Sequence, residues 1–142
     1  MESDKVVIIV QNSSGQLFVH QRSADKKIFP LLYGLGAGGH VKPKESPIQA
    51  AKRELKEELS IDAEVKSLFG INFELNTVKH TVHAVHVFRV SYDGDVKPCK
   101  EFKWSGWMDI EEVDQLAGDN KLCPDTKVLY EKWREEYLYK DR

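Results

Sequence analysis

The chain has 142 residues, enough for one domain with a hydrophobic core and too few for two domains of ordinary size. Hydrophobic residues make up 41% and charged residues 31%, a balance typical of folded proteins and not of disordered ones. The 21 basic and 23 acidic side chains give a formal net charge of −2, which argues against a general electrostatic role on nucleic acid or on an anionic membrane. We therefore expect a single domain over residues 1–142.

The first apolar run and the cysteine content indicate in which cellular compartment the protein is expected. The run from Val6 to Val10 is too short to span a bilayer or to form the core of a secretory signal. Cys99 and Cys123 are too few for a disulfide framework, and their spacing matches no zinc site. We expect both thiols to be reduced, with one disulfide as the alternative, and the chain to be cytoplasmic.

The first elements are predicted to be strands. The β-branched run from Val6 to Val10 is typical of a buried strand, and residues 17–22 are expected to return after a polar turn as the second strand of a hairpin. Residues 23–33 predict a loop. The segment 34–41 contains four glycines, which indicates a backbone that must come close to another group.

Residues 46–59 carry the clearest helix signal. Ser46 is a good N-cap, Pro47 suits the first helical position, and Gln49 completes the spacing of a capping box. Apolar residues recur at helical spacing and are expected to face the core. They are Ile48, Ala51, Leu55 and Leu59.

The remaining elements alternate between strands and helices. We expect strands over residues 63–75, 81–92 and 102–108, and helices over residues 109–117 and 124–139. This order predicts an α/β sandwich in which helices cover both faces of a mixed sheet. The inner stripe of the last helix is expected to include Val128, Leu129, Trp133 and Tyr137.

Three carboxylates of the first helix lie three and four residues apart, so that Glu54, Glu57 and Glu58 share one side of it. Like charges this close repel each other, and two arrangements would relieve the repulsion. Either the carboxylates face water beside basic neighbours such as Lys56, or a hard divalent cation such as Mg²⁺ binds them through their oxygens. The helix alone leaves both open.

The context of this helix resembles a known family. Gly39, Glu45 and the run from Arg53 to Ile61 together resemble the 23-residue signature of the Nudix hydrolases. The resemblance implies a Nudix-type α/β/α sandwich over nearly the whole chain. Ser60 departs from the signature because the family has glycine there, just past the helix, where a left-handed backbone is often needed. Lys44 stands where a glycine often precedes the signature glutamate.

The resemblance implies catalytic roles for Glu57, Arg53 and Glu101. Arg53 would orient a neighbouring glutamate, and Glu45 would mainly brace the loop before the helix. Glu101 lies six residues before Trp107, which is similar to the placement of a late general base in the family, although an exposed loop charge is the alternative. The implied cofactor is Mg²⁺, with Mn²⁺ as an alternative. The implied metal ligands are Glu54, Glu57, Glu58 and the carbonyl of Gly38.

One branch of the family is especially similar, that of the isopentenyl-diphosphate isomerases and their hydrolase-like bacterial relatives. The isomerases need a cysteine just before the Gly-His pair, and here that position is Gly38. The missing thiol favours a hydrolase over an isomerase. The similar segments are residues 19–23, 26–27, 29–30 and 38–41.

Substrate binding is predicted for four residues near these segments. Arg22 and Lys27 are cations suited to a diphosphate, although most such side chains are simply solvated. His40 follows the glycine pair. Tyr33 is one of three aromatic residues that could stack on a base or flank an apolar group, with core packing as the alternative. These aromatic residues are Phe29, Tyr33 and Trp104.

Three further histidines, His80, His83 and His86, lie close together in the sequence but are not expected to form a metal site. In a strand, His80 and His86 share a face while His83 points to the other. The outer two would lie about 20 Å apart, too far to bind one ion. We leave their roles unassigned.

The leading hypothesis is a Mg²⁺-dependent hydrolase that cleaves a phosphoanhydride bond in a nucleoside diphosphate linked to another moiety. The alternatives are an isomerase of isopentenyl diphosphate and a Nudix-like module that senses a nucleotide without turnover. The expected partner is a small diphosphate compound, without a membrane or nucleic acid, and a homodimer is left open.

Overall fold

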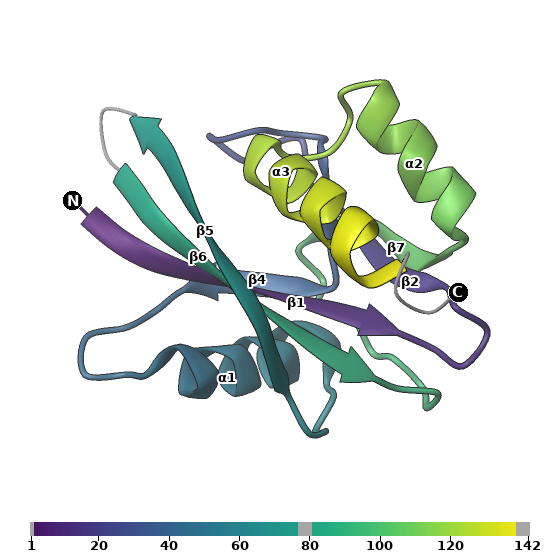
Figure 1. Cartoon of the computed structure of the whole chain (residues 1–142), viewed down its shortest axis with the longest axis horizontal. Helices are drawn as coiled ribbons and strands as arrows, with labels where there is room; N and C mark the ends of the chain where they lie inside the picture. Colours follow the sequence, from purple (N-terminus) through teal and green to yellow (C-terminus); the bar gives the residue numbers. More distant parts are fainter. Residues whose placement is uncertain (1, 77–80, 139–142) are drawn as a thin grey trace.

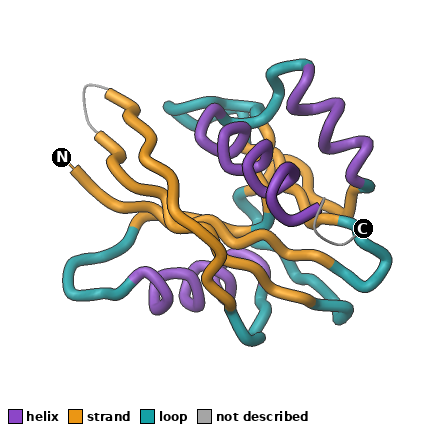
Figure 2. The backbone as a smooth tube through the Cα atoms, viewed as in Figure 1, coloured by secondary structure: helices purple, strands orange, loops and turns teal. Residues whose placement is uncertain are grey.

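The computed structural model describes residues 2–76 and 81–138 and shows a twisted sheet between two layers of helices (Figures 1 and 2). The strands are β1 (Glu2–Gln11), β2 (Leu17–Arg22), β3 (Tyr33–Leu35), β4 (Ala37–His40), β5 (Lys66–Asn76), β6 (Thr81–Ser91) and β7 (Phe102–Met108). The helices are α1 (Pro47–Leu59), α2 (Ile110–Gly118) and α3 (Pro124–Trp133), and a π-helical turn spans Arg134–Leu138.

The sheet is mixed, as the sequence predicted. Its strand order is β3-β2-β1-β6-β5, with β4 paired to β1 and β7 paired to β2. The β1–β6 pair is parallel, and the other pairs are antiparallel. This topology, with α1 on one face and α2 and α3 on the other, confirms the expected α/β sandwich (Figure 1).

The central strand β1 is apolar along its whole middle because both of its faces are covered. Val6, Ile8 and Val10 belong to the core under α1, whereas Val7 and Ile9 belong to the core under α2 and α3. Side chains alternate between the faces of a strand, so a strand buried on both sides needs an unbroken apolar run. The same strand therefore holds both layers together.

The glycine-rich segment forms two short strands, β3 and β4. Gly36 separates β3 from β4 and has φ +52°, a conformation that side chains rarely adopt. A Cβ atom at this position would collide with the carbonyl oxygen of Ile8. The break lets the chain pair first with β2 and then with β1.

Two predicted core positions are wrong. Ile48 is 41% exposed because it lies in the first turn of α1, where helical spacing does not ensure burial. Ala50, which was not among the predicted core residues, is buried instead. Val128 is 45% exposed because it lies opposite the buried stripe of α3. That stripe consists of Asp125, Thr126, Leu129, Tyr130 and Trp133.

The C-terminal helix changes type after Trp133 and continues to Leu138 as the π-helical turn. Its α-helical part ends at Trp133, and Tyr139, the predicted end, lies outside the described residues. Cys99 and Cys123 are both free, as expected. Over the part of the chain that the structure describes, every helix is too short or too polar to cross a bilayer.

Candidate active site

Helix α1 begins at the cap that the sequence predicted. The Ser46 hydroxyl accepts the N–H of Gln49 at 3.3 Å, and the Gln49 side-chain oxygen accepts the N–H of Ser46 at 2.9 Å. Pro47 occupies the first helical position, where its missing N–H costs nothing. This cap fixes the start of the helix and hence the positions of the carboxylates that follow.

Arg53 anchors the helix to the loop before it. Its guanidinium donates to both carboxylate oxygens of Glu45, with Nε···Oε2 at 2.8 Å and Nη2···Oε1 at 2.9 Å. Nη2 also donates to the carbonyl oxygen of His40 at 3.1 Å. The bonds from Arg53 and from the backbone N–H of Lys42 lower the pKa of Glu45 to about 2. The loop carboxylate is therefore fixed in its charged form.

The same guanidinium reaches two carboxylates on its own helix. Arg53 Nη1 donates to Glu54 at 2.6 Å and to Glu57 at the longer distance of 3.4 Å. Burial raises the pKa of Glu54, and the bond from Arg53 opposes that change. Arg53 therefore favours the ionised form of a carboxylate whose burial favours the neutral form.

Glu58 lies against the backbone of β4. Its Oε1 accepts the N–H of Gly38 at 2.7 Å. Burial raises the pKa of this carboxyl group to about 7, the nearby charges of Glu54 and Glu101 add to the rise, and the Gly38 N–H opposes it. Near neutral pH, a nearby cation would readily bring Glu58 into its charged form.

The two glycines of β4 allow two close approaches, Gly39 to Glu54 and Gly38 to the neighbouring strand β1. A Cβ atom at Gly39 would lie 2.6 Å from the carboxyl carbon of Glu54, and one at Gly38 would lie 2.7 Å from the carbonyl oxygen of Val6. Any side chain at residue 39 would therefore push Glu54 away from the strand.

The three helix carboxylates differ in their surroundings. Glu54 and Glu58 lie beside the Gly38–Gly39 backbone, whereas the side chain of Glu57 is 56% exposed and turns toward Arg53. Across the described residues, no three carboxylate, imidazole or thiol groups converge on one point in this conformation. The donors are hard oxygens of the kind that Mg²⁺ prefers, and exposed Glu57 has room to change rotamer. The residues thus fit a divalent ion by their chemistry.

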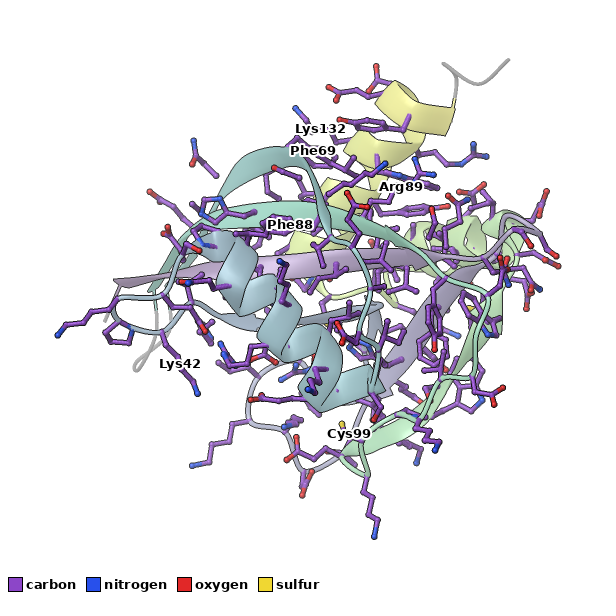
Figure 3. The ribbon with its side chains drawn as sticks, turned by 90° about the horizontal axis from the view of Figure 1, so that it is seen from below. Lys42, Phe69, Phe88, Arg89, Cys99 and Lys132 are labelled. Atoms are coloured by element: carbon purple, nitrogen blue, oxygen red, sulfur yellow. The ribbon has the colours of Figure 1, made fainter. Side chains whose placement is uncertain are left out.

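Both positions that depart from the signature glycines have left-handed backbones, as expected for Ser60. Ser60 has φ 57° and Lys44 has φ 67°. Past the end of α1, the Ser60 hydroxyl donates to the carbonyl of Lys97 at 3.1 Å, and the N–H of Cys99 donates to the carbonyl of Glu58 at 2.7 Å. Cys99 accordingly lies beside this end of the helix (Figure 3). These contacts hold the segment that leads to Glu101.

A cavity of about 320 Å³ opens beside the glycine-containing strand β4. Glu58 and Glu101 line it together with three cationic side chains, Lys5, Arg22 and Lys26. Acidic and basic groups therefore face the same space, which suits a ligand that carries phosphates and a bound cation. The apolar lining includes Val7, Ile28, Phe29, Leu35, Ala37, Phe73 and Phe102.

The structure brings some predicted site residues to this cavity and not others. Arg22, His40, Gly38, Glu58 and Glu101 line it. The other predicted residues are absent from the lining. They are Lys27, Tyr33, Arg53, Glu54 and Glu57.

Tyr33 lies at a separate surface depression, which it shares with Trp104. The ring centroids of these two aromatic residues are 6.2 Å apart in an edge-to-face contact. Lys26, the neighbour of Lys27, lines the main cavity instead, 3.7 Å from Glu101.

Sequence reasoning missed the part of the cavity that comes from distant elements. Lys5 of β1 pairs with Asp125 of α3 at 2.9 Å, and both line the cavity, as does His20 of β2. One signal was present, because Lys5 directly precedes a strongly apolar run. A charged side chain beside a buried strand needs a partner.

The remaining histidines contribute nothing to this cavity within the described residues. His80 and the side chain of His83 lie outside them. His86 Nε2 lies 3.2 Å from the carboxylate of Asp4, in a partly exposed pair.

Comparison with known proteins gives a consistent result. The family model described as NUDIX domain matches residues 1–128. An uncharacterized Nudix hydrolase of Streptomyces coelicolor is 30% identical over 130 residues, which cover 91% of this chain and 72% of the relative. Isopentenyl-diphosphate Delta-isomerase 2 of Aromatoleum aromaticum is 29% identical over 127 residues, which cover 85% of this chain and 64% of the relative. The chain thus spans about two thirds of the length of these relatives.

Solved structures share the fold. A MutT protein from Methanosarcina mazei has a TM-score of 0.78 and 25% identity, covering 95% of this chain and 94% of the other. The NUDIX domain of Shewanella oneidensis NrtR, complexed with ADP ribose, has a TM-score of 0.75 and 18% identity, covering 95% and 88%. With the sandwich fold and the glutamate-bearing helix, these matches lead to one conclusion: the chain belongs to the Nudix hydrolase family.

Proposed function

We propose that this protein is a Mg²⁺-dependent hydrolase that cleaves a phosphoanhydride bond in a nucleoside diphosphate linked to another moiety. One observation carries the proposal: a single cavity holds Glu58 beside the Gly38–Gly39 backbone and is also lined by Lys5, Arg22 and Lys26. Carboxylates suit a divalent ion, and lysine and arginine suit phosphate oxygens. The cytoplasm, a reducing compartment, suits the two free cysteines.

The ion would be held by Glu54, Glu57, Glu58 and the carbonyl of Gly38, with Mn²⁺ as an alternative to Mg²⁺ because both accept oxygen ligands. When bound, such an ion neutralises phosphate charge and lowers the pKa of a water molecule. Glu57 joins the other carboxylates in this proposal by a change of rotamer, which its exposure allows.

The protein's own groups have distinct proposed roles. Arg53 would favour the charged form of Glu54 and hold its carboxylate in place by a hydrogen bond. Glu101, at the mouth of the cavity with 75% of its side chain exposed, would take the proton from the attacking water, with Glu57 as the other candidate. Arg22, with Lys26 beside it, would bind phosphate oxygens. Roles for Lys27, Tyr33 and His40 in binding the substrate stay predictions, as does a homodimer.

The size of the cavity and the structural neighbour support the substrate class. A volume of about 320 Å³ suits a small ligand, since such pockets begin near 300 Å³. The Shewanella oneidensis domain, which shares the fold, was solved with ADP ribose, a nucleoside diphosphate joined to a sugar. We carry that class of ligand to this protein as a proposal.

Isomerisation of isopentenyl diphosphate is the second candidate, favoured by the Aromatoleum aromaticum relative. Gly38 lacks the expected thiol, but Cys123, distant in sequence, lines the same cavity. Burial raises the pKa of this thiol to about 11, so at neutral pH it is protonated and a poor base. Interconversion of the two isoprenoid diphosphates by the purified protein would establish this candidate over hydrolysis.

Hydrolysis of a panel of nucleoside diphosphate compounds in Mg²⁺ tests the leading proposal. We expect Glu57→Gln and Glu58→Gln to lower kcat/KM by about 100-fold or more, because loss of groups that merely support metal ligands already costs 10- to 100-fold. Product release is measured with and without EDTA.

The matched control is Glu64→Gln, which changes an exposed glutamate outside α1 and should leave turnover unchanged. A wild-type protein that turns over no compound of the panel would refute the proposal. Turnover by Glu57→Gln and Glu58→Gln equal to that of the wild type would also refute the proposal.

A further inference from the structure

His20 is held in one orientation inside the cavity by two separate contacts. Its Nδ1 lies 2.7 Å from the carbonyl oxygen of Gly36, and its ring stacks on that of Phe102 with centroids 4.2 Å apart and planes inclined by 9°. His20 and Phe102 both line the cavity. A side chain fixed in this way loses little further freedom when a ligand binds.

The hydrogen bond to Gly36 determines the tautomer. A carbonyl oxygen only accepts, so Nδ1 carries the proton and donates it. Burial lowers the pKa of His20 to about 4, and the charges of Arg22 and Lys5 also favour the neutral form. At neutral pH, Nε2 therefore presents a lone pair, and within the described part of the chain no group donates a hydrogen bond to it.

The neighbouring strand approaches the Nε2 edge of the ring with a residue that has no side chain. Gly34 of β3 pairs with His20 and also lines the cavity. A Cβ atom at Gly34 would lie 2.6 Å from Nε2 and 2.9 Å from Cε1. Even an alanine here would collide with the Nε2 edge of the ring, so this position of His20 requires glycine at residue 34.

We propose that His20 Nε2 accepts a hydrogen bond from an N–H or O–H group on the non-phosphate moiety of the substrate. Nucleosides and sugars carry such donors, whereas the hydrocarbon tail of isopentenyl diphosphate has none. The inference rests on the proposed function and deepens it, because it makes His20 a specificity residue that selects nucleoside and sugar diphosphates. A site built to bind a donor rejects analogues that lack it.

His20→Asn tests the acceptor because asparagine can keep an N–H near the position of Nδ1 while removing Nε2. We expect KM for ADP ribose with Mg²⁺ to rise about 10- to 100-fold with little change in kcat, which is the effect of losing one buried hydrogen bond. The Kd of ADP ribose in EDTA, measured by calorimetry, should rise by a similar factor. His86→Asn, the same change outside the cavity, is the control and should alter neither value.

The comparison ligand is isopentenyl diphosphate. Its Kd should be the same for the wild type and His20→Asn, because its tail offers Nε2 no proton. Gly34→Ala should weaken ADP ribose as His20→Asn does. Gly70→Ala is the matched control, since a Cβ atom there would meet its nearest neighbour at an ordinary 3.7 Å.

The ¹⁵N NMR signal of His20 Nε2 gives a readout that a purely structural role would not move. In the free protein it should report an unprotonated nitrogen, and it should shift upfield when ADP ribose binds and stay in place with isopentenyl diphosphate. Equal ADP ribose Kd for the wild type and His20→Asn, or an unmoved Nε2 signal, would overturn this inference alone. Absence of ADP ribose binding by the wild type would overturn it too, whereas ADP ribose binding without turnover of any compound of the panel would refute only the proposed hydrolysis.

Discussion

The carboxyl group of Glu58 is held where its charge is disfavoured. It is partly buried beside β4, and burial raises its pKa from 4.5 to about 7. Since the folded state binds the proton more tightly than the unfolded state, folding is favoured while Glu58 is protonated. The protein therefore gives up stability at neutral pH to keep this carboxylate in the site.

The pH dependence of unfolding should show this cost. As pH rises from 4.5 to 7, the unfolded state loses the proton first, so the Glu58 contribution to the free energy of unfolding falls by at most about 3 kcal/mol. Glu58→Gln removes the ionisation and should be more stable than the wild type at pH 8, by up to that amount, and not at pH 4. Urea unfolding without divalent ions measures the difference.

Glu57→Gln is the control, because Glu57 is 56% exposed and its replacement should shift the free energy of unfolding by less than about 0.5 kcal/mol. A Glu58→Gln advantage that is the same at pH 4 and pH 8 would contradict the assigned cause.

The contacts of Arg53 show which interactions of a single residue can be predicted from the sequence. Helical spacing puts Glu57 one turn from Arg53, yet the contact between them is the longest that Arg53 makes with a carboxylate, at 3.4 Å. The shorter bonds go to adjacent Glu54 and to Glu45 in the preceding loop. Helix geometry fixes neighbours within the helix, whereas the fold of the loop decides the contact with Glu45.

At the scale of elements, α1 is flanked by two residues in left-handed conformations where the family pattern has glycine. Lys44 precedes the helix with φ 67°, and Ser60 follows it with φ 57°. A left-handed backbone costs a residue with a side chain about 1 to 2 kcal/mol. These two positions are therefore sites where glycine should stabilise the fold.

Lys44→Gly should raise the free energy of unfolding by about 0.5 to 1 kcal/mol, since relief of the strain exceeds the added entropy of the unfolded chain. Thermal and urea unfolding both measure this change. Lys42→Gly, in the same loop but without a positive φ, should instead be destabilising. A destabilised Lys44→Gly variant would show that its side chain contributes more than the backbone strain costs.

Local sequence signals located most elements well. The predicted bounds of β2 and β7 match those of the structure, and the capping box places the start of α1. The signals failed where burial depends on distant partners, as for exposed Val128, and where a long glycine-rich run divides at Gly36 to pair with two different strands. Periodicity describes one element and does not identify what covers it.

At the scale of the whole molecule, Lys5 and Asp125 join the sheet to α3 across the cavity. Their side chains are only 25% and 8% exposed, with Nζ and Oδ2 2.9 Å apart. Removing one partner of such a pair leaves the other charge poorly solvated. We therefore expect substitutions in this pair to change both the free energy of unfolding and the shape of the cavity that the two residues line.

Asp125→Asn should lower the free energy of unfolding by about 2 to 3 kcal/mol, and adding Lys5→Met should recover part of that loss. Lys26→Met is the control. Its ion pair with Glu101 is exposed and 3.7 Å long, so it should change stability by less than about 0.5 kcal/mol. If the variant with both Asp125→Asn and Lys5→Met were no more stable than Asp125→Asn alone, the proposed energetic coupling between Lys5 and Asp125 would be contradicted.

The sequence by itself determined the family, the sandwich of strands and helices, and the helix that bears Glu54, Glu57 and Glu58. These features follow from spacing within one helix or strand, which geometry fixes locally. Only the tertiary structure decided which distant side chains complete the cavity. It brought Lys5, His20 and Asp125 to one space from β1, β2 and α3, because contacts between elements depend on how their buried faces pack together.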